Sequence, residues 1–465
     1  MLSKLLVSSQ SGLSASTAIY IFTIVVLPLV LAAGFLGRKG HVSTTRRRLK
    51  NLRRLGISTS NMTNQYDVPK GASTNRPPRI KALFIHPVKS CAPIELERAQ
   101  ITKTGLMFDR ICALAIEDKT RADDKSGGWR FLSQRTRPNM SLIKTELWLP
   151  HDGSDRNDPL VQAGGCILLS FSDPDVPSRI SKLEAILQTW SISATPEVLI
   201  TIPLKLTAAQ MTEYKVESRT FDILGRNASG LDIANLPSIA EALPKLRKFL
   251  NISKQNALTF LICTPSHYTR TDTNLAPLER IGTPSVQGFT DDQPINLNSI
   301  SSVHAVSELL PSENRPLNAM RFRANIWIDG AAAFDEDTWK RWRIVTKRES
   351  QTPRARVAAM LSVVARASRC TMPNVNPLTG TFTASNPLPT KKKGKPQPSA
   401  TLVEYRTVED SNSAALGFIG VHCVPEDFNL KEAEQKGKGL FIQVGDEIEV
   451  LDRGTHYHGA TANDY

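Results

Sequence analysis

Residues 368–380 read Ser-Arg-Cys-Thr-Met-Pro-Asn-Val-Asn-Pro-Leu-Thr-Gly. This stretch places Cys370 between an apolar run at 360–365 and a turn whose Pro and Gly are typical of tight bends. Arg369, directly before the cysteine, favours the thiolate, which is the form of cysteine that binds metals and attacks electrophiles. A single cysteine in an intracellular protein is more often a small buried hydrophobe than a ligand. The role of Cys370 therefore depends on which other residues the fold brings to it.

The composition of the 465-residue chain is that of a globular protein with two or three domains. Apolar residues make up 40% of the chain, and its 29 prolines and 26 glycines predict frequent turns. The cysteines form no CxxC pair and no metal-finger spacing, which argues against a disulfide scaffold and for a reducing compartment. The six cysteines are Cys91, Cys112, Cys166, Cys263, Cys370 and Cys423.

The net charge of +14 is concentrated in two segments. Residues 1–66 contain nine Lys or Arg and no Asp or Glu, and four more lysines lie in the Pro-rich stretch 383–400. The remainder of the chain is close to neutral, so the sequence predicts no nucleic-acid groove. The low complexity of 383–400 predicts a disordered insertion.

Residues 18–36 are uncharged and apolar, and as a helix they are long enough to cross a bilayer core of about 30 Å. Eight Lys or Arg follow between residues 38 and 54, and the positive-inside rule keeps such a flank in the cytosol. Only Lys4 precedes the stretch, which is also longer than the core of a typical signal peptide. We therefore expect a single-pass anchor, with a short tail at 1–17 across the membrane and the body in the cytosol.

Beyond the anchor, the apolar pattern predicts many short strands and few helices. A basic, polar linker is expected at 37–78, with order beginning at Arg79. Helices are predicted at 235–250 and 298–310. Strands are predicted at 80–87, 94–101, 111–117, 129–133, 140–149, 166–171, 257–265 and 321–328, and a strand–turn–strand pair at 440–451.

Four short islands of Lys, Arg, Ser and Asp have the chemistry of an anion site. Lys offers a point charge, Arg a two-pronged donor and Ser a short hydroxyl. Each island by itself is more often a solvated surface charge, so their number and order carry the argument. The islands are Pro87–Cys91, Phe108–Arg110, Thr290–Asp292 and Arg321–Asn325.

Together with residues 368–380, these islands resemble the MOSC-domain family, and within it the mitochondrial amidoxime-reducing component. The resemblance covers about residues 79–455. It rests on PVKSC at 87–91, Asp-Arg at 109–110, Ser-Gln-Arg at 133–135, RFRANIWIDG at 321–330, SRC and NPLTG within 368–380, and VGDEIEV at 444–450.

The resemblance implies an α+β fold that is predominantly β and is preceded by one transmembrane helix. It comprises an N-terminal MOSC-type β-barrel domain and a MOSC β-barrel domain with peripheral helices. The expected boundaries are 79–205 for the N-terminal barrel domain, 206–285 for a connecting α/β segment, 286–455 for the MOSC domain and 456–465 for a tail.

The resemblance also implies a molybdenum cofactor, in which a pterin dithiolene holds molybdenum and Cys370 is the protein's thiolate ligand. A soft thiolate suits such a metal. Asp291 is expected to move protons during oxygen removal, a role that needs a titratable group within hydrogen-bond reach. No haem, flavin or nucleotide is expected on this chain. The residues expected to hold or line the cofactor are Lys89, Ser90, Arg110, Thr290, Asp291, Asp292, Arg323, Asn325, Ser368, Arg369 and His422.

Two of these positions depart from the family pattern. Asp292 stands where a hydroxyl residue is usual, and His422 stands where a tyrosine is usual.

The implied activity is the reduction of N-oxygenated compounds, such as amidoximes and hydroxylamines, by removal of an oxygen atom. The implied electron donors are cytochrome b5 and its NADH-dependent reductase, and the expected location is the mitochondrial outer membrane or, alternatively, the endoplasmic reticulum membrane. Two other functions stay open. One is a MOSC carrier of the cofactor or of sulfur without turnover, and the other is a membrane-tethered adaptor whose basic segment 38–54 binds anionic lipids.

Overall fold

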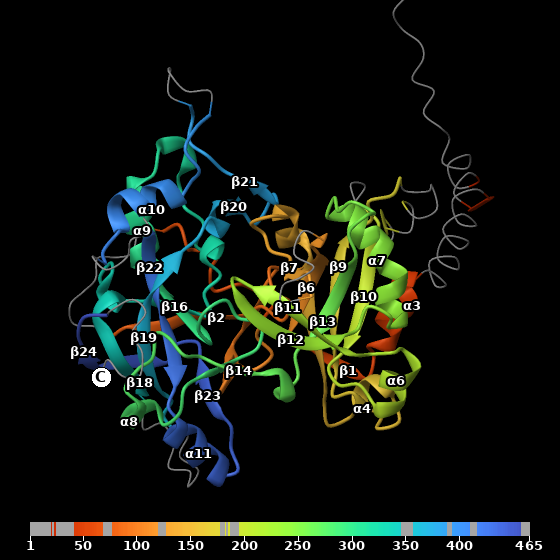
Figure 1. Cartoon of the computed structure of the whole chain (residues 1–465), viewed down its shortest axis with the longest axis horizontal. Helices are drawn as coiled ribbons and strands as arrows, with labels where there is room; N and C mark the ends of the chain where they lie inside the picture. Colours follow the sequence, from red (N-terminus) through yellow and green to blue (C-terminus); the bar gives the residue numbers. More distant parts are fainter. Residues whose placement is uncertain are drawn as a thin grey trace, which may run out of the picture. The chain divides into compact units, whose positions relative to one another are not determined.

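Figure 1 shows the computed structural model of the chain. The chain forms two compact units. One unit comprises residues 1–50 and 172–199 and includes α3 (His41–Arg48); the other comprises residues 51–171 and 200–465 and contains the barrels and the candidate site. The described residues are 20, 23–24, 41–67, 77–119, 127–176, 182, 185–186, 195–345, 357–387, 393–409 and 416–456.

Within these ranges, no helix has both the length and the apolar character needed to cross a membrane. The anchor expected at 18–36 lies outside the described residues, apart from Tyr20, Thr23 and Ile24. The tail at 1–17 also lies outside them.

Strands from the middle of the chain close into a barrel with two earlier ones. Neighbouring strands are antiparallel, except that β11 and β7 run parallel. Ala113 and Ala115 on β6 meet Phe221 and Ile223 on β11 in one apolar cluster, because alternate residues of a strand face the same side. In order, the barrel comprises β11 (Ser218–Ile223), β12 (Arg226–Asp232), β13 (Leu258–Ile262), β6 (Cys112–Glu117) and β7 (Trp129–Phe131).

The second sheet joins the start of the chain to its C-terminal half. The strand β2 pairs with β17 and also with β24, so the sheet returns on itself. Trp327, Trp339 and Trp342 are fully buried in it. In order, the sheet contains β17 (Ile326–Asp329), β16 (Ile295–Ser299), β22 (Gly417–Pro425), β19 (Met360–Arg369), β18 (Trp339–Val345), β24 (Glu447–Arg453), β2 (Arg79–Ile85) and β3 (Ile94–Leu96).

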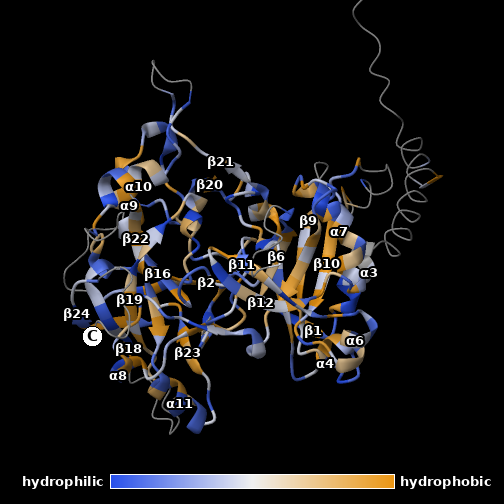
Figure 2. Cartoon of the chain, viewed as in Figure 1, coloured by the Kyte–Doolittle hydropathy of each residue, from blue (hydrophilic) through white to orange (hydrophobic). Residues whose placement is uncertain are grey.

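Two further sheets and several helices complete the described fold. One sheet has the order β1 (Leu52–Leu55), β8 (Lys144–Pro150), β9 (Cys166–Ser172) and β10 (Glu197–Pro203), and the other β23 (Leu440–Gln443), β4 (Arg98–Thr102) and β5 (Gly105–Leu106). Figure 2 shows that β9 and β10 are hydrophobic along most of their length. Short pairs are formed by β14 (Thr269–Arg270) with β15 (Val286–Gln287) and by β20 (Val375–Asn376) with β21 (Thr381–Phe382). The helices are α4 (Pro159–Gln162), α6 (Ala208–Glu213), α7 (Pro237–Phe249), α8 (Leu278–Ile281), α9 (Ile300–Leu309), α10 (Ser399–Arg406) and α11 (Asp427–Gln435).

The predominantly β fold with barrels and peripheral helices is confirmed. The predicted helices correspond to α7 and α9, and the predicted strands before residue 172 correspond to β2, β3 with β4, β6, β7, β8 and β9. The strand–turn–strand pair at 440–451 is also present as β23 and β24, although the two strands join different sheets.

Four local predictions are corrected: the strand at 321–328, the disorder at 383–400, the linker at 37–78 and the tail at 456–465. The strand predicted at 321–328 begins only at Ile326, because residues 319–322 form a 3₁₀ turn and Arg323 adopts a left-handed conformation. The stretch 383–400 is not wholly disordered, since Ala384 pairs with Pro396 and α10 begins at Ser399; residues 388–392 lie outside the described ranges.

The linker at 37–78 and the tail at 456–465 also contain ordered residues. Within 37–78, α3 forms and β1 pairs with β8. Met62 is buried in the same apolar cluster as Phe322, so the mostly polar segment before β2 contributes a side chain to the core. His456 is buried, and its Nε2 lies 2.8 Å from the Trp339 carbonyl oxygen.

Candidate functional site

The pairing of β2, β17 and β16 explains why three of the sequence islands meet. β16 and β17 run parallel, so the loop that ends at Asp292 and the turn that contains Arg323 lead into the same edge of the sheet. β2 runs antiparallel to β17, so the loop with Lys89, which follows β2, leaves from that edge. Residues about 200 positions apart in the chain are therefore brought into hydrogen-bond contact there.

Lys89 and Asp291 form an ion pair at this edge. The Lys89 ammonium also donates to the Phe289 carbonyl oxygen at 2.8 Å and lies 4.9 Å from the centre of the Phe131 ring. Burial lowers the pKa of Lys89 to about 8, although Asp291 opposes this shift. Burial would raise the pKa of Asp291, but Lys89 above all, then Arg135, lowers it to about 2. Asp291, with 37% of its side chain exposed, is therefore ionised at neutral pH.

Arg110 connects Asp109, Asn325 and Arg323 on the other side of this edge. Its guanidinium pairs with buried Asp109 and donates to the Asn325 Oδ1 at 3.3 Å and to the Arg323 carbonyl oxygen at 3.1 Å. Burial opposes ionisation of Asp109, but Arg110 and His86 lower the pKa of this carboxyl to about 2. Asp109 also accepts from the His86 main-chain N–H at 2.7 Å. This buried carboxylate therefore fixes where Arg110 points.

Three of the predicted residues have backbone conformations that are uncommon outside glycine. The φ angles are 68° at Ser90, 49° at Arg110 and 51° at Arg323. A non-glycine residue in this region costs about 1–2 kcal/mol and persists only where its surroundings impose it. At Ser90 one such constraint is visible, because Gln134 Nε2 donates to its carbonyl oxygen at 2.7 Å. Such strain is concentrated at binding and catalytic sites.

Arg323 is a buried cation of the site whose hydrogen bonding is incomplete. Only 7% of Arg323 is exposed, and its Nη2 atom is buried with no hydrogen-bond partner among the described residues. Burial, reinforced by Arg110, lowers the pKa of Arg323 to about 10. A buried cation with an unpaired N–H is costly unless an anion completes it. The edge therefore has a place for a negatively charged ligand.

Arg369 connects the end of β19 to this edge. Its Nη2 atom donates to Asn296 Oδ1 at 3.0 Å and to Asn298 Oδ1 at 3.1 Å, and its Nη1 atom donates to the Phe322 carbonyl oxygen at 3.1 Å. Asn298 has room because residue 420 is glycine, with a φ of 76°; a Cβ there would lie 1.4 Å from Asn298 Oδ1. Burial lowers the pKa of Arg369 to about 10.

Cys370 follows Arg369 at the end of β19 and is partly exposed. The other five cysteines are buried, and burial raises the pKa of Cys91 to about 12. The segment after Cys370 is tied to the turn before Arg323, because Arg321 Nη1 donates to the Pro373 carbonyl oxygen at 3.1 Å. The accessible thiol is thus held on the segment next to the arginine-rich edge.

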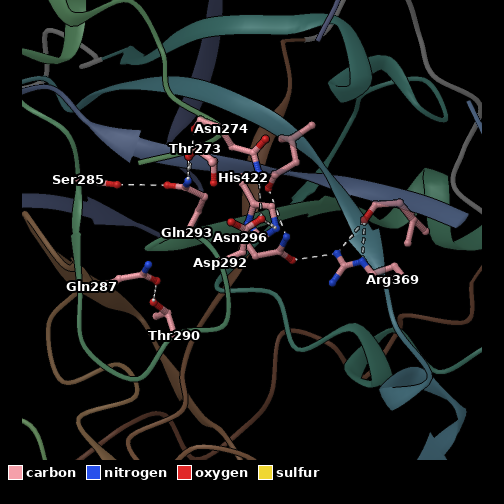
Figure 3. A network of polar contacts seen from close by, with 12 residues as sticks. Thr273, Asn274, Ser285, Gln287, Thr290, Asp292, Gln293, Asn296, Arg369 and His422 are labelled. Carbon is pink, nitrogen blue, oxygen red and sulfur yellow. Dashed lines mark hydrogen bonds and ion pairs between the residues drawn. The ribbon is translucent and has the colours of Figure 1, made fainter. Parts of the chain in front are cut away.

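The two residues that depart from the family pattern lie beside each other. His422 on β22 is opposite Asn296 on β16, and its Nε2 atom lies 3.7 Å from Asp292 Oδ2. Figure 3 shows Asp292, His422 and Asn296 together, with Arg369 reaching Asn296. Burial lowers the pKa of His422, while Asp292 opposes that shift.

Two further predicted residues are Thr290 and Ser368. The Thr290 hydroxyl donates to Gln287 Oε1 at 3.0 Å, inside its own loop (Figure 3). Ser368 is half-buried on β19, opposite Phe418. Their expected part in lining the cofactor stays a prediction.

Three residues of the site were missed by the sequence analysis. Asn296 and Asn298 alternate on an otherwise apolar strand, so they share one face, and this pattern could have marked them. Arg226, at the start of β12, donates to the Gly288 and Thr290 carbonyl oxygens, both at 3.0 Å. Nothing in the local sequence distinguishes it, since its partners are main-chain atoms of a distant loop.

Comparisons with known proteins agree with this arrangement. Residues 77–171 match the MOSC N-terminal beta barrel domain, and residues 284–449 match the MOSC domain. The chain is also similar to the molybdenum cofactor sulfurase of Oryza sativa subsp. japonica, with 22% identity over 376 residues, which is 79% of this chain and 35% of that protein. The chain thus spans about a third of the length of this relative.

The strand pairing, the arginine-rich edge and the two matches lead to one conclusion. The chain contains a MOSC N-terminal beta barrel domain followed by a MOSC domain, and it is related at low identity to a molybdenum cofactor sulfurase.

Proposed function

We propose that this protein binds a molybdenum cofactor and uses it to reduce N-oxygenated compounds such as amidoximes and hydroxylamines. The two MOSC domains and the sulfurase relative support the association with a molybdenum cofactor. The choice of N–O substrates rests on the order of the sequence motifs and goes further than the comparisons.

The unpaired Nη2 atom of buried Arg323 is the observation that carries the proposal. Arg110 and Lys89 lie in the same group, which therefore presents several cations to one ligand. A pterin cofactor with an anionic phosphate and ring oxygens matches this set, because guanidinium groups bind such acceptors through charge-assisted hydrogen bonds. The partly exposed thiol of Cys370 adds a soft ligand of the kind molybdenum accepts.

Each residue then has a defined task. Arg323, Arg110 and Asn325 would hold the anionic part of the cofactor, and Cys370 would bind the metal. When bound, the molybdenum centre would supply two-electron transfer of an oxygen atom. Asp291 was expected to move protons, but Lys89 keeps it ionised, so at neutral pH it carries no proton to donate.

The reaction takes its electrons from outside the chain. We propose cytochrome b5 and its NADH-dependent reductase as donors, and residues 18–36 as an anchor in the mitochondrial outer membrane or the endoplasmic reticulum membrane. The choice of electron donors rests on the sequence motifs. The membrane anchor rests on the apolar stretch 18–36.

A carrier of the cofactor or of sulfur is the second candidate. The similarity to a molybdenum cofactor sulfurase favours it, and the partly exposed Cys370 is accessible to a partner. Electron transfer separates the two functions. Oxidation of reduced cytochrome b5 by the loaded protein on addition of a hydroxylamine supports the reductase, whereas cofactor binding without such oxidation supports the carrier.

The cofactor claim is tested by measuring molybdenum and pterin per mole of purified full-length chain. Arg323→Ala should lose about 1.5–3 kcal/mol of binding, which is roughly ten- to a hundredfold in cofactor affinity. Arg343→Ala is the matched control, because Arg343 is exposed and pairs with Glu449 at 2.7 Å, outside the site. Wild-type protein without molybdenum, or equal retention in Arg323→Ala, would refute the site.

A further inference from the structure

His422 and Asp292 form an acid–base pair at the edge of the candidate site. Asp292 lies in the loop that precedes β16, and His422 lies on β22, the next strand in the sheet. The His422 Nε2 and Asp292 Oδ2 atoms are 3.7 Å apart (Figure 3). The His422 side chain is only 14% exposed, whereas 41% of the Asp292 side chain is exposed. One member of the pair thus faces the interior and the other reaches water.

The surroundings of the pair connect it to the site. Arg369 and Arg110 are the cations close enough to influence His422, and both belong to the arginine-rich edge. Asn274 Nδ2 donates to Asp292 Oδ2 at 3.4 Å, which helps to fix the carboxylate. Asn296, which lies opposite His422 on the neighbouring strand, accepts from Arg369 Nη2 at 3.0 Å. The pair therefore adjoins the hydrogen-bond network of the candidate site.

We propose that His422 and Asp292 are a proton-transfer pair that delivers protons from solvent to the candidate site. This inference rests on the proposed function, because it assigns protons to that reaction.

The proposed reaction needs a proton source that Asp291 does not provide. Removing oxygen from a hydroxylamine as water breaks the N–O bond and consumes two electrons and two protons; the electrons come from the external haem-protein donor. Neutral His422 takes one proton from water on the Asp292 side and becomes an imidazolium paired with that carboxylate. The imidazolium then releases the proton to the departing oxygen and returns to its neutral form, and a second cycle supplies the second proton.

The charges around His422 suit a side chain that takes up a proton and then releases it. Burial, Arg369 and Arg110 lower the pKa of His422, so the imidazole is mostly neutral at pH 7 and its protonated form is a stronger acid than free imidazole. Asp292 opposes this shift, and it therefore favours proton uptake by His422.

The pair can be tested first without cofactor. Histidine-labelled full-length protein is titrated by NMR, and the His422 signal is identified by its loss in His422→Gln. Its midpoint should lie below that of an exposed histidine, and Asp292→Asn should lower it by about half a unit or more, because the carboxylate no longer favours the charged form. Asp452→Asn is the matched control, since Asp452 is 40% exposed and pairs with Arg280 outside this network. An unchanged midpoint in Asp292→Asn would overturn the pairing.

The loaded protein provides the second test, with hydroxylamine reduction measured against pH. With turnover expressed per mole of bound molybdenum, His422→Gln should lose about a hundredfold and regain part of this on addition of imidazole. Asp292→Asn should shift the pH profile to lower pH. Full turnover and an unchanged profile in both variants would refute the proton-transfer pair. A wild-type protein that binds the cofactor but reduces no N–O substrate would instead refute the proposed reaction, and the NMR titration would still decide the pairing.

Discussion

At the scale of single residues, the site is built from ionisable groups that burial forces into specific partnerships. His86 is the extreme case, because it is fully buried and its Nδ1 atom lies 3.6 Å from the Asp109 Oδ1 atom, with Arg110 and Arg323 nearby. Burial, together with Arg323 and Arg110, lowers its pKa to about 3. The cations that would bind an anion thus keep the neighbouring imidazole neutral.

This arrangement predicts that the protein loses stability in mild acid. The unfolded chain binds a proton at His86 below about pH 6.5, whereas the folded protein does not until about pH 3. The free energy of unfolding should therefore fall as pH drops through this window, by about 2 kcal/mol from this residue between about pH 7.5 and 5.

Urea unfolding at the two pH values measures this effect. His86→Phe should remove about 2 kcal/mol of the pH dependence, and His151→Gln, in an exposed loop, should keep the wild-type dependence. The same pH dependence in wild type and His86→Phe would show that His86 does not titrate as the structure implies.

Residue type and order were sufficient to predict which charged residues gather, because Lys89 contacts Asp291 and Arg110 contacts Asn325. They were insufficient to predict where each side chain points. The Thr290 hydroxyl is used by Gln287 within its own loop, and that choice depends on how the loop closes in three dimensions. The pairing of His422 with Asp292 likewise follows from strand register, which a single sequence does not specify.

At the scale of elements, the 3₁₀ turn before β17 explains why the strand at 321–328 was predicted too long. The residues are apolar and basic in alternation, as in a strand, but Asn318 accepts from the Met320 N–H at 2.9 Å and starts a turn instead. Arg323 then adopts a left-handed conformation at the end of that turn. The local pattern predicted a strand from Arg321, but the cap at Asn318, three residues earlier, starts a turn, and the strand begins only at Ile326.

The loop before β16 depends on the barrel through Arg226. Its two hydrogen bonds to the Gly288 and Thr290 carbonyl oxygens tie this loop to β12. Arg226→Ala should lower the local opening free energy of residues 288–292 by about 1–3 kcal/mol, so that their amides exchange about tenfold faster or more.

Hydrogen exchange followed by mass spectrometry reports this change directly. Arg219→Ala is the control, because Arg219 is on β11 of the same barrel but pairs with Asp232 at 2.6 Å. Equal exchange of 288–292 in wild type and Arg226→Ala would show that the loop keeps its structure without the two hydrogen bonds from Arg226.

At the scale of the whole molecule, the site is assembled from distant parts of the chain. β2 lies within the stretch that matches the MOSC N-terminal beta barrel domain, yet it pairs with β17 and β24 of the later sheet. Such pairing has a large sequence separation, and this is why the sequence predicted strands but not their partners. The segment before β2 takes part as well, because Gln65 Oε1 accepts from the Ala319 N–H at 2.8 Å and Met62 is 3% exposed.

This segment sets where a soluble version of the protein can begin. A chain that starts at Asn51 keeps β1, Met62 and Gln65, whereas a chain that starts at Arg79 loses all three. Burial of Met62 alone contributes about 1.5–3 kcal/mol, and the bond from Ala319 to Gln65 supports the turn that carries Arg323. The chain from Arg79 should therefore melt several degrees lower and retain less molybdenum than the chain from Asn51. Met62→Ala in the longer chain should reproduce part of the loss of melting temperature, and Gln65→Ala part of the loss of cofactor. Equal melting temperature and equal cofactor content in the two chains would show that residues 51–67 only cover the surface.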